Sequence, residues 1–204
     1  MDILLIRHGL TQGNLEKRYV SNTDEHLLNE EVLRLKAVAM KLTDNSDYLS
    51  LLDGLNHVYV SSRVRTQETA KLLFAGLSLR VVEELDECDF GEFEYMNYRE
   101  LSGNRDYQLY IDSNGEASFP GGESKAAFTS RIMSALNRIV SNDSSDIICI
   151  VAHGGTLRAI LSELVVPHKD YFDWEIDNGC GYLLHSEGEN NYTVSGLYPG
   201  HFTG

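Results

Sequence analysis

Short apolar runs alternate with stretches of helical periodicity along almost the whole chain. This alternation constrains the fold strongly, because strands that alternate with helices build a mostly parallel sheet with helices on both faces. The predicted strands cover residues 1–6, 58–60, 79–85, 147–151, 181–185 and 192–198. The last two form a predicted hairpin around the turn at 188–191. We therefore predict an α/β fold with a mostly parallel central sheet flanked by helices.

Helical patterns occupy the segments between these strands. The predicted helices cover residues 29–42, 65–74, 94–101, 123–140 and 156–164, with Asn29 as the N-cap of the first. Residues 91–122 interrupt the pattern with glycines and aromatic side chains, and we interpret them as a small insertion that covers a site. With 204 residues, the chain suits one compact domain, and residues 1–204 are predicted to form it.

The formal net charge of −14 restricts the classes of partner. An acidic surface repels nucleic acid and anionic membranes, so neither is an expected partner. No apolar run is long enough to span a bilayer, and the first residues lack a signal-peptide pattern. The cysteines, Cys88, Cys149 and Cys180, form no CxxC motif, which favours free thiols in a reducing cytoplasm. We predict no cofactor and no metal, since no metal-binding histidine motif is present.

Three predicted strands end in arginine, histidine or glycine residues. The motifs at these ends are Arg7-His8-Gly9, Ser62-Arg63 and His153-Gly154-Gly155. The carboxyl ends of parallel strands meet at one edge of the sheet, where α/β proteins bind ligands. Guanidinium groups match phosphate oxygens, and glycines let backbone N–H groups approach a ligand closely. We therefore predict a locally positive phosphate pocket at this edge.

The same motifs suggest phosphoryl transfer. A neutral imidazole such as that of His8 can attack phosphorus and form a covalent phosphohistidine. The arginines and the second histidine would then stabilise charge on the transferred phosphoryl group. A carboxylic acid must protonate the leaving oxygen, and Glu87, just past a predicted strand, is the first candidate. Glu84 is the second candidate for this role.

Five blocks of residues, in order along nearly the whole chain, resemble those of the histidine phosphatase superfamily, which includes the cofactor-dependent phosphoglycerate mutases. The blocks are Arg7-His8-Gly9 with Thr11 and Asn14; Ser61-Ser62-Arg63 with Arg65, Thr66, Gln67, Thr69 and Ala70; 85–91; 120–124; and 151–155. The resemblance implies a phosphoglycerate mutase-like three-layer sandwich and chemistry without a metal. It also makes His8 the phosphorylated histidine, His153 its phosphate-binding companion and Glu87 the general acid.

The resemblance completes the predicted site. The predicted catalytic residues are His8, Glu87, Arg7, Arg63 and His153, and the predicted phosphate-binding residues are Arg7, Asn14, Thr11, Arg63, His153 and Gly154. Structural alternatives exist, since Thr11 and Asn14 also fit as helix caps and Arg63 could pair with an acid. Two positions depart from the family pattern. Leu10 stands where many members carry an acid, and Tyr95 stands where glycine is frequent.

We predict a metal-independent phosphomonoesterase that acts on a small-molecule phosphate ester. The compact length resembles the α-ribazole phosphatase branch, which makes α-ribazole phosphate a candidate substrate. A phosphoglycerate mutase is an alternative, but only Arg99 and Arg105 in the insertion could help to hold a bisphosphorylated intermediate. A phospho-ligand binder without catalysis is a second alternative, and it would have no need of a general acid. The predicted hairpin also offers a sheet edge through which two copies could pair as a homodimer.

Overall fold

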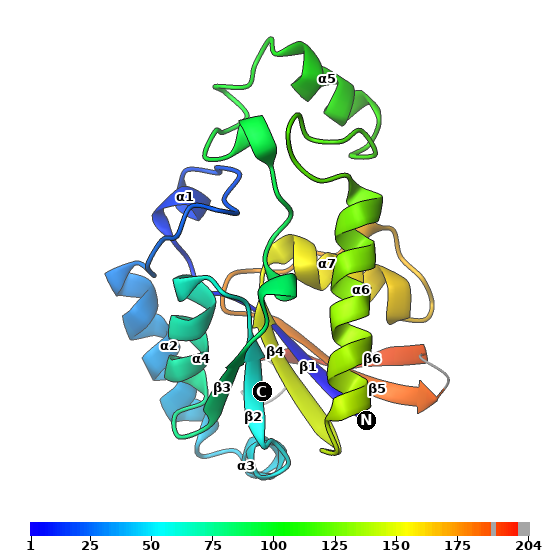
Figure 1. Ribbon diagram of the computed structural model, residues 1–204. Helices are drawn as coiled ribbons and strands as arrows, with labels where there is room; N and C mark the ends of the chain where they lie inside the picture. Colours follow the sequence, from blue (N-terminus) through cyan, green and yellow to red (C-terminus); the bar gives the residue numbers. More distant parts are fainter. Residues whose placement is uncertain (189–190, 200–204) are drawn as a thin grey trace.

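The computed structural model describes residues 1–188 and 191–199 of the chain. In this part, six strands form one sheet in the order β3-β2-β4-β1-β5-β6 (Figure 1). The strands are β1 (Asp2–Arg7), β2 (His57–Val60), β3 (Ser78–Val81), β4 (Ile147–Ala152), β5 (Gly181–Gly188) and β6 (Asn191–Tyr198). Strands β1 to β4 run parallel, while β5 and β6 pair antiparallel at one side. The predicted α/β fold with a mostly parallel sheet is confirmed.

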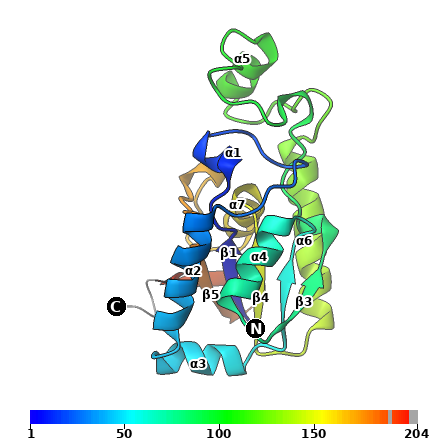
Figure 2. The ribbon, with the colours of Figure 1, turned by 90° about the vertical axis from the view of Figure 1, so that its left-hand side faces the viewer.

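Helices cover both faces of this sheet (Figures 1 and 2). One face carries α2 (Asn29–Leu42) and α4 (Val64–Leu73), the other α6 (Lys125–Asn142) and α7 (Gly154–Leu164), and α3 (Ser46–Asp53) lies near the lower end of the sheet in Figure 1. Side chains alternate between the faces of a strand. In β1, Leu4 and Ile6 pack in the core beneath α2 and α4. Ile3 and Leu5 pack in the core beneath α6 and α7. The apolar run therefore serves two cores at once.

The register between β1 and β4 positions the motifs that follow these strands. Ile6 lies opposite Val151 and Arg7 opposite Ala152. The backbone N–H of His8 donates to the carbonyl of Ala152 at 2.9 Å, which continues the pairing one residue further. The two strands therefore end side by side, as the parallel arrangement requires.

The insertion stands above the carboxyl edge of the sheet (Figures 1 and 2). The predicted helix at 94–101 is wrong, and the helix of this region is α5 (Arg105–Asp112). The chain instead forms a short 3-10 turn at η2 (Gly91–Phe93), and Tyr95 then adopts a positive φ of 62°. A helix cannot continue through a left-handed residue. An aromatic cluster that includes Tyr19, Phe90 and Phe119 holds the insertion to the rest of the protein.

Several predicted boundaries also differ from the structure. The predicted strand 79–85 is shorter, because β3 ends at Val81 and residues 83–85 form the 3-10 turn η1 (Glu83–Leu85). Asn29 is the first residue of α2, and its N-cap is Leu28. Helix α7 begins at Gly154, two residues earlier than predicted, and α3 was not predicted. The hairpin strands β5 and β6 are present, while residues 189–190 of the predicted turn lie outside the described part. No helix in the described part is long and apolar enough to cross a membrane.

Candidate active site

Two buried histidines meet where β1 and β4 end. His8 follows β1 and His153 follows β4 as the N-cap of α7. Their ring centroids lie 5.2 Å apart in an edge-to-face arrangement. Both side chains are almost fully shielded from solvent, at 3% and 0% exposed. The strand register that sets the fold therefore also sets the spacing of the two imidazoles.

The ring of His8 is held in one tautomer. Its Nδ1 lies 2.7 Å from the carbonyl oxygen of Gly9, and a carbonyl can only accept a hydrogen bond. The neutral ring therefore carries its proton on Nδ1 and keeps the lone pair on Nε2. Burial, together with the positive charges of Arg65 and Arg7, lowers the pKa of His8 well below its usual value of 6.5. His8 is thus a neutral imidazole with an unprotonated Nε2 at neutral pH.

His153 has one bonded and one unbonded ring nitrogen. Its Nε2 lies 2.7 Å from the hydroxyl oxygen of Ser61. Its Nδ1 is buried and finds no hydrogen-bond partner within the described residues, and the same holds for Nε of Arg7, Arg63 and Arg65. Buried polar atoms without partners are rare in native proteins, and each calls for an explanation such as a ligand. The nitrogens of His153, Arg7 and Arg65 are consistent with a site that an anion completes.

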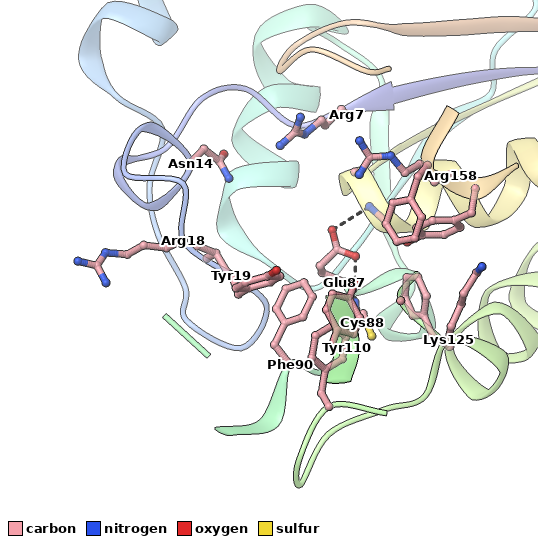
Figure 3. A pocket seen from close by; sticks show the side chains of 18 of the residues that line it. Arg7, Asn14, Arg18, Tyr19, Glu87, Cys88, Phe90, Tyr110, Lys125 and Arg158 are labelled. Carbon is pink, nitrogen blue, oxygen red and sulfur yellow. Dashed lines mark hydrogen bonds between the residues drawn. The ribbon is translucent and has the colours of Figure 1, made fainter. Parts of the chain in front are cut away.

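A cavity of about 520 Å³ opens between the carboxyl edge of the sheet and the insertion (Figure 3). Its lining residues are Arg7, His8, Asn14, Arg18, Tyr19, Val20, Glu87, Cys88, Phe90, Tyr110, Ile111, Asn114, Gly115, Phe119, Lys125, Phe128, Gly154, Gly155, Arg158, Tyr171 and Phe172. Five of the predicted site residues are among them: Arg7, His8, Asn14, Glu87 and Gly154. A basic end beside His8 and a largely aromatic wall thus share one pocket.

Glu87 lies in the loop after η1, and its carboxyl group contacts the N-terminus of α7. Its Oε2 accepts the backbone N–H of Gly155 at 2.9 Å, and its Oε1 accepts that of Cys88 at 3.0 Å (Figure 3). A carboxylate is favoured at a helix N-terminus, where backbone N–H groups have no partner within the helix. The structure therefore places Glu87 in the pocket with His8, as the sequence predicts, and holds its carboxyl group by the backbone. Glu84, the second candidate, is paired with Arg138 instead.

Close packing against Glu87 explains why a glycine occupies position 155. A Cβ atom there would lie 2.2 Å from Oε1 of Glu87 and 2.9 Å from the hydroxyl oxygen of Tyr171. We expect Gly155→Ala to displace the Glu87 carboxyl group and to lower kcat/KM by about 10-fold or more for any reaction that uses this carboxyl group.

Steady-state kinetics of Gly155→Ala beside Gly154→Ala would check this expectation. At position 154 a Cβ would lie 3.4 Å from Nε of Arg7, an ordinary contact distance, so the loss should be smaller. Equal activity of the two variants would contradict the role given to close packing at Gly155.

The structure places Arg63 apart from the pocket. Arg63 is the N-cap of α4, with an extended backbone (φ −75°, ψ 138°), and its Nη2 pairs with Asp86 at 3.0 Å. The side chain also bonds to Asn22, which makes the ion-pair alternative the observed arrangement. Arg63 stands just before the first helical turn, and its side chain contacts Asp86 and Asn22.

Arg65, two residues further on, is the buried arginine of this segment. It lies on the inner face of α4, is 0% exposed, and donates to the carbonyls of Val20, Ser21 and Thr23. After burial, its charge is the largest influence that lowers the pKa of both His8 and His153. The sequence analysis did not predict that Arg65 would be the arginine buried beside the two histidines. Helical spacing could have indicated this position, since Arg65 stands four residues before the buried Thr69 on the same helix face.

Asn14 and Thr11 differ in their positions. Asn14 lines the pocket, and its Oδ1 accepts from Nδ2 of Asn178 at 3.1 Å. Thr11 is the N-cap of α1 (Gln12–Leu15), and its hydroxyl donates to Glu25 at 2.7 Å. Thr11 is fully buried and absent from the pocket lining, so the cap alternative describes its contacts.

These features define a class of protein. It is an α/β protein with a pair of neutral histidines, the buried Arg65 and the half-buried Arg7 at the carboxyl edge of a mostly parallel sheet. Residues 3–196 match the family model of the histidine phosphatase superfamily (branch 1), and the chain belongs to this superfamily.

Similar proteins within the superfamily are named as phosphatases or as phosphoglycerate mutases. The adenosylcobalamin/alpha-ribazole phosphatase of Escherichia coli (strain K12) is 26% identical over 88% of this chain and 87% of its own. A probable phosphoglycerate mutase GpmB of Cronobacter sakazakii is also 26% identical, over 81% of this chain and 75% of its own. The crystal structure of the alpha-ribazole phosphatase from Shigella flexneri superimposes with a TM-score of 0.82 at 25% identity, covering 97% of this chain and 96% of that one.

Proposed function

We propose that the protein is a metal-independent phosphomonoesterase that hydrolyses a small-molecule phosphate ester through a phosphohistidine. The observation that carries the proposal is the state of His8, a neutral ring whose unprotonated Nε2 belongs to a side chain that lines the pocket. A neutral, fixed imidazole is the form that attacks phosphorus. Glu87, in the same pocket, supplies the carboxyl group that hydrolysis of an alkyl phosphate requires.

In the proposed reaction, Nε2 of His8 attacks phosphorus and the bond to the ester oxygen breaks. The protonated carboxyl of Glu87 gives its proton to that oxygen, so that a neutral alcohol leaves. Glu87 then takes a proton from water, the water oxygen bonds to phosphorus, and the bond to Nε2 breaks to release inorganic phosphate. Each step is an in-line displacement at phosphorus, and the residues at the basic end of the pocket stabilise the charge on the other three oxygens.

The phosphoryl oxygens need several donors. We assign them to Arg7, Asn14 and the backbone N–H of Gly154, which line the pocket, and to the buried Arg65, whose charge acts on both histidines. His153 joins them in the tautomer that carries its proton on Nδ1, since Ser61 then donates to Nε2. Arg65 replaces Arg63 in the phosphate-binding role predicted from the sequence, because Arg65 is buried and its charge acts on both histidines.

The proposal also includes a candidate for the alcohol that leaves. α-Ribazole phosphate is the first candidate, since two of the relatives are named for α-ribazole phosphatase activity. The aromatic side chains Tyr19, Phe90 and Tyr110 line the pocket away from the basic end, and they would suit the flat base of such a nucleotide.

A phosphoglycerate mutase is the second candidate function. The insertion's own basic residues, Arg99 and Arg105, are absent from the pocket lining. However, Lys125 and Arg158 reach the pocket from α6 and α7, so basic groups are supplied by other elements. A transferred phosphoryl group that returns to a second hydroxyl, without release of phosphate, would identify this activity.

The leaving group gives the sharpest test of the phosphatase mechanism. With EDTA present, we expect wild-type protein to release phosphate from both p-nitrophenyl phosphate and α-ribazole phosphate. Glu87→Gln should lower kcat for the alkyl ester by about 10²–10⁴-fold, because an alkoxide needs a proton in order to leave. The same variant should lower cleavage of p-nitrophenyl phosphate much less, since p-nitrophenolate leaves without one.

Glu84→Gln is the matched control, because Glu84 pairs with Arg138 outside the pocket. Loss of turnover on addition of EDTA would overturn the metal-independent mechanism. Equal losses on both esters in Glu87→Gln would remove Glu87 from the role of general acid. Release from no ester, with phosphate exchange between glycerate positions in the presence of a bisphosphoglycerate, would replace the proposal by the mutase.

A further inference from the structure

The turn that precedes β5 lies next to the residues that follow β1. The two strands pair antiparallel, and in such a pair the residues before one strand lie beside those after the other. Residues 177–180 form this turn, and Gly179 within it has a positive φ of 71°, a conformation that favours glycine. The N–H of Gly179 donates to the carbonyls of Arg7 at 3.0 Å and His8 at 3.1 Å. The sheet therefore brings the turn to the backbone of the histidine proposed as nucleophile.

The side chain of Asn178, in the same turn, bridges this backbone and the side chain of Asn14. Its Nδ2 donates to the carbonyl oxygen of His8 at 3.0 Å and to Oδ1 of Asn14 at 3.1 Å. A longer contact of 3.4 Å reaches the carbonyl oxygen of Gly9, which is the atom that holds Nδ1 of His8. Asn178 therefore connects the proposed nucleophile with a residue proposed to bind the phosphoryl group.

These contacts fix which end of the Asn14 amide is free. Oδ1 of Asn14 accepts two N–H groups, one from Asn178 and one from the backbone of Thr11 at 3.4 Å. The reversed amide would turn its NH₂ group against both donors, so only one orientation satisfies them. Nδ2 of Asn14 bonds to no acceptor among the described residues, and Asn14 lines the same pocket as Arg7 and Glu87 (Figure 3). The amide thus keeps its N–H donors available to a bound anion.

Helix α2 also holds the turn. The backbone carbonyl of Asn178 accepts Nη2 of Arg34 at 2.9 Å. Nε of Arg34 pairs in turn with Oε2 of Glu31 at 2.7 Å, and Glu31 is buried. Contacts from α2 and from the end of β1 therefore set the position of Asn178, so that its side chain is in place before a ligand binds.

We propose that Asn178 is a positioning residue that acts through Asn14, since it keeps Nδ2 of Asn14 available to the anion and ties that donor to the backbone of His8. Asn178 itself is absent from the pocket lining, so its effect reaches the ligand through Asn14. This inference rests on the proposed function, in which Asn14 binds the transferred phosphoryl group. A donor that is already oriented needs no reorganisation when charge develops on the phosphoryl oxygens.

A double-mutant cycle on the binding of inorganic phosphate, measured by titration calorimetry, tests the inference. Asn14→Ala should weaken binding by about 10-fold or more, the scale of a lost hydrogen bond to a charged group. Asn178→Leu, which removes both N–H donors at similar size, should weaken binding by about 5-fold or more, because the Asn14 amide is then free to turn. In the Asn14→Ala background, Asn178→Leu should weaken binding by less than about 2-fold, because the group that it positions is already absent.

Steady-state kinetics with p-nitrophenyl phosphate give the same cycle for kcat/KM, and this cycle decides the inference if phosphate binds too weakly for calorimetry. Asn56→Leu is the matched control, because Asn56 is exposed, precedes β2, bonds to Ser145 and lies outside the pocket lining. It should keep phosphate affinity and kcat/KM within about 2-fold of wild type. Thermal unfolding of every variant monitors stability. If Asn178→Leu is unfolded under assay conditions, Asn178→Ala takes its place in the cycle.

The outcomes separate this inference from the phosphatase function. Losses that multiply in the double variant would show that Asn178 does not act through Asn14 and would overturn the inference. Wild-type phosphate affinity in Asn178→Leu would also overturn it. If no ester is hydrolysed but phosphate binds with the expected coupling, the phosphatase proposal fails and the inference stands. If wild-type protein neither binds phosphate nor hydrolyses an ester, both fail.

Discussion

Replacing His8 by alanine is expected to lower kcat/KM for every phosphate ester by at least about 10⁴-fold, as loss of a nucleophile does in other enzymes. The reason lies in the way the ring is held. The carbonyl of Gly9 fixes Nδ1, and burial beside Arg65 and Arg7 keeps the imidazole neutral. Among the side chains that line the pocket in the described part, His8 carries the one imidazole, and Nε2 of the neighbouring His153 is hydrogen-bonded to Ser61.

The measurement combines phosphate release with trapping of the intermediate. Wild-type protein quenched during turnover of a ³²P-labelled ester should carry a label that is stable in alkali and lost in acid, and His8→Ala should carry none. His168→Ala is the control, since His168 is exposed and lies outside the pocket. Full activity of His8→Ala would refute the phosphohistidine mechanism. An unchanged label on His8→Ala would move the nucleophile to another residue.

Arg65→Met is expected to lower kcat/KM by about 10²–10³-fold, the usual effect of removing one preorganised donor to transition-state charge. Arg63→Met should lower kcat/KM by less than about 10-fold, because Arg63 is only partly buried and its guanidinium group pairs with Asp86 and bonds to Asn22. The two variants remove the same charge from positions two residues apart. Comparing their kcat/KM values therefore separates the effect of the arginine's position from the effect of losing one positive charge.

Stability must be measured along with activity, because Arg65 donates to three backbone carbonyls that its loss would leave without partners. Thermal unfolding of each variant, and calorimetry of inorganic phosphate binding, would separate misfolding from lost phosphate contact. Arg65→Lys should recover part of the phosphate affinity, since the charge is retained. A larger loss in Arg63→Met than in Arg65→Met would return the phosphate role to Arg63.

The strands and the two histidines could be predicted because their signals are local. The apolar runs that become β1 and β4 are buried on both faces, and such runs indicate central parallel strands whatever surrounds them. Parallel pairing then brings the ends of the two strands together, so His8 and His153 meet without any further information. Glu87, which follows β3 and η1, and Asn14, which lies in α1 after β1, both line the pocket, and their roles stay predictions.

The insertion could not be predicted so well, because long-range contacts decide its conformation. The sequence at 94–101 is compatible with a helix, but Tyr95 has a positive φ. Its hydroxyl donates to Glu25 at 2.8 Å, and its carbonyl accepts from Arg18 at 2.6 Å. These partners lie 70 and 77 residues away in the chain. Tertiary contacts thus stabilise a backbone conformation that local propensity disfavours.

The sequence by itself determined the sheet, the family and the pair of histidines, since each follows from a contiguous run or motif. Only the tertiary structure decided which arginine of α4 faces the histidines, because the side-chain direction depends on where the helix begins. It also decided the composition of the pocket wall, where Lys125, Arg158 and Tyr171 come from separate elements. A pocket wall built from distant segments leaves no local pattern in the sequence.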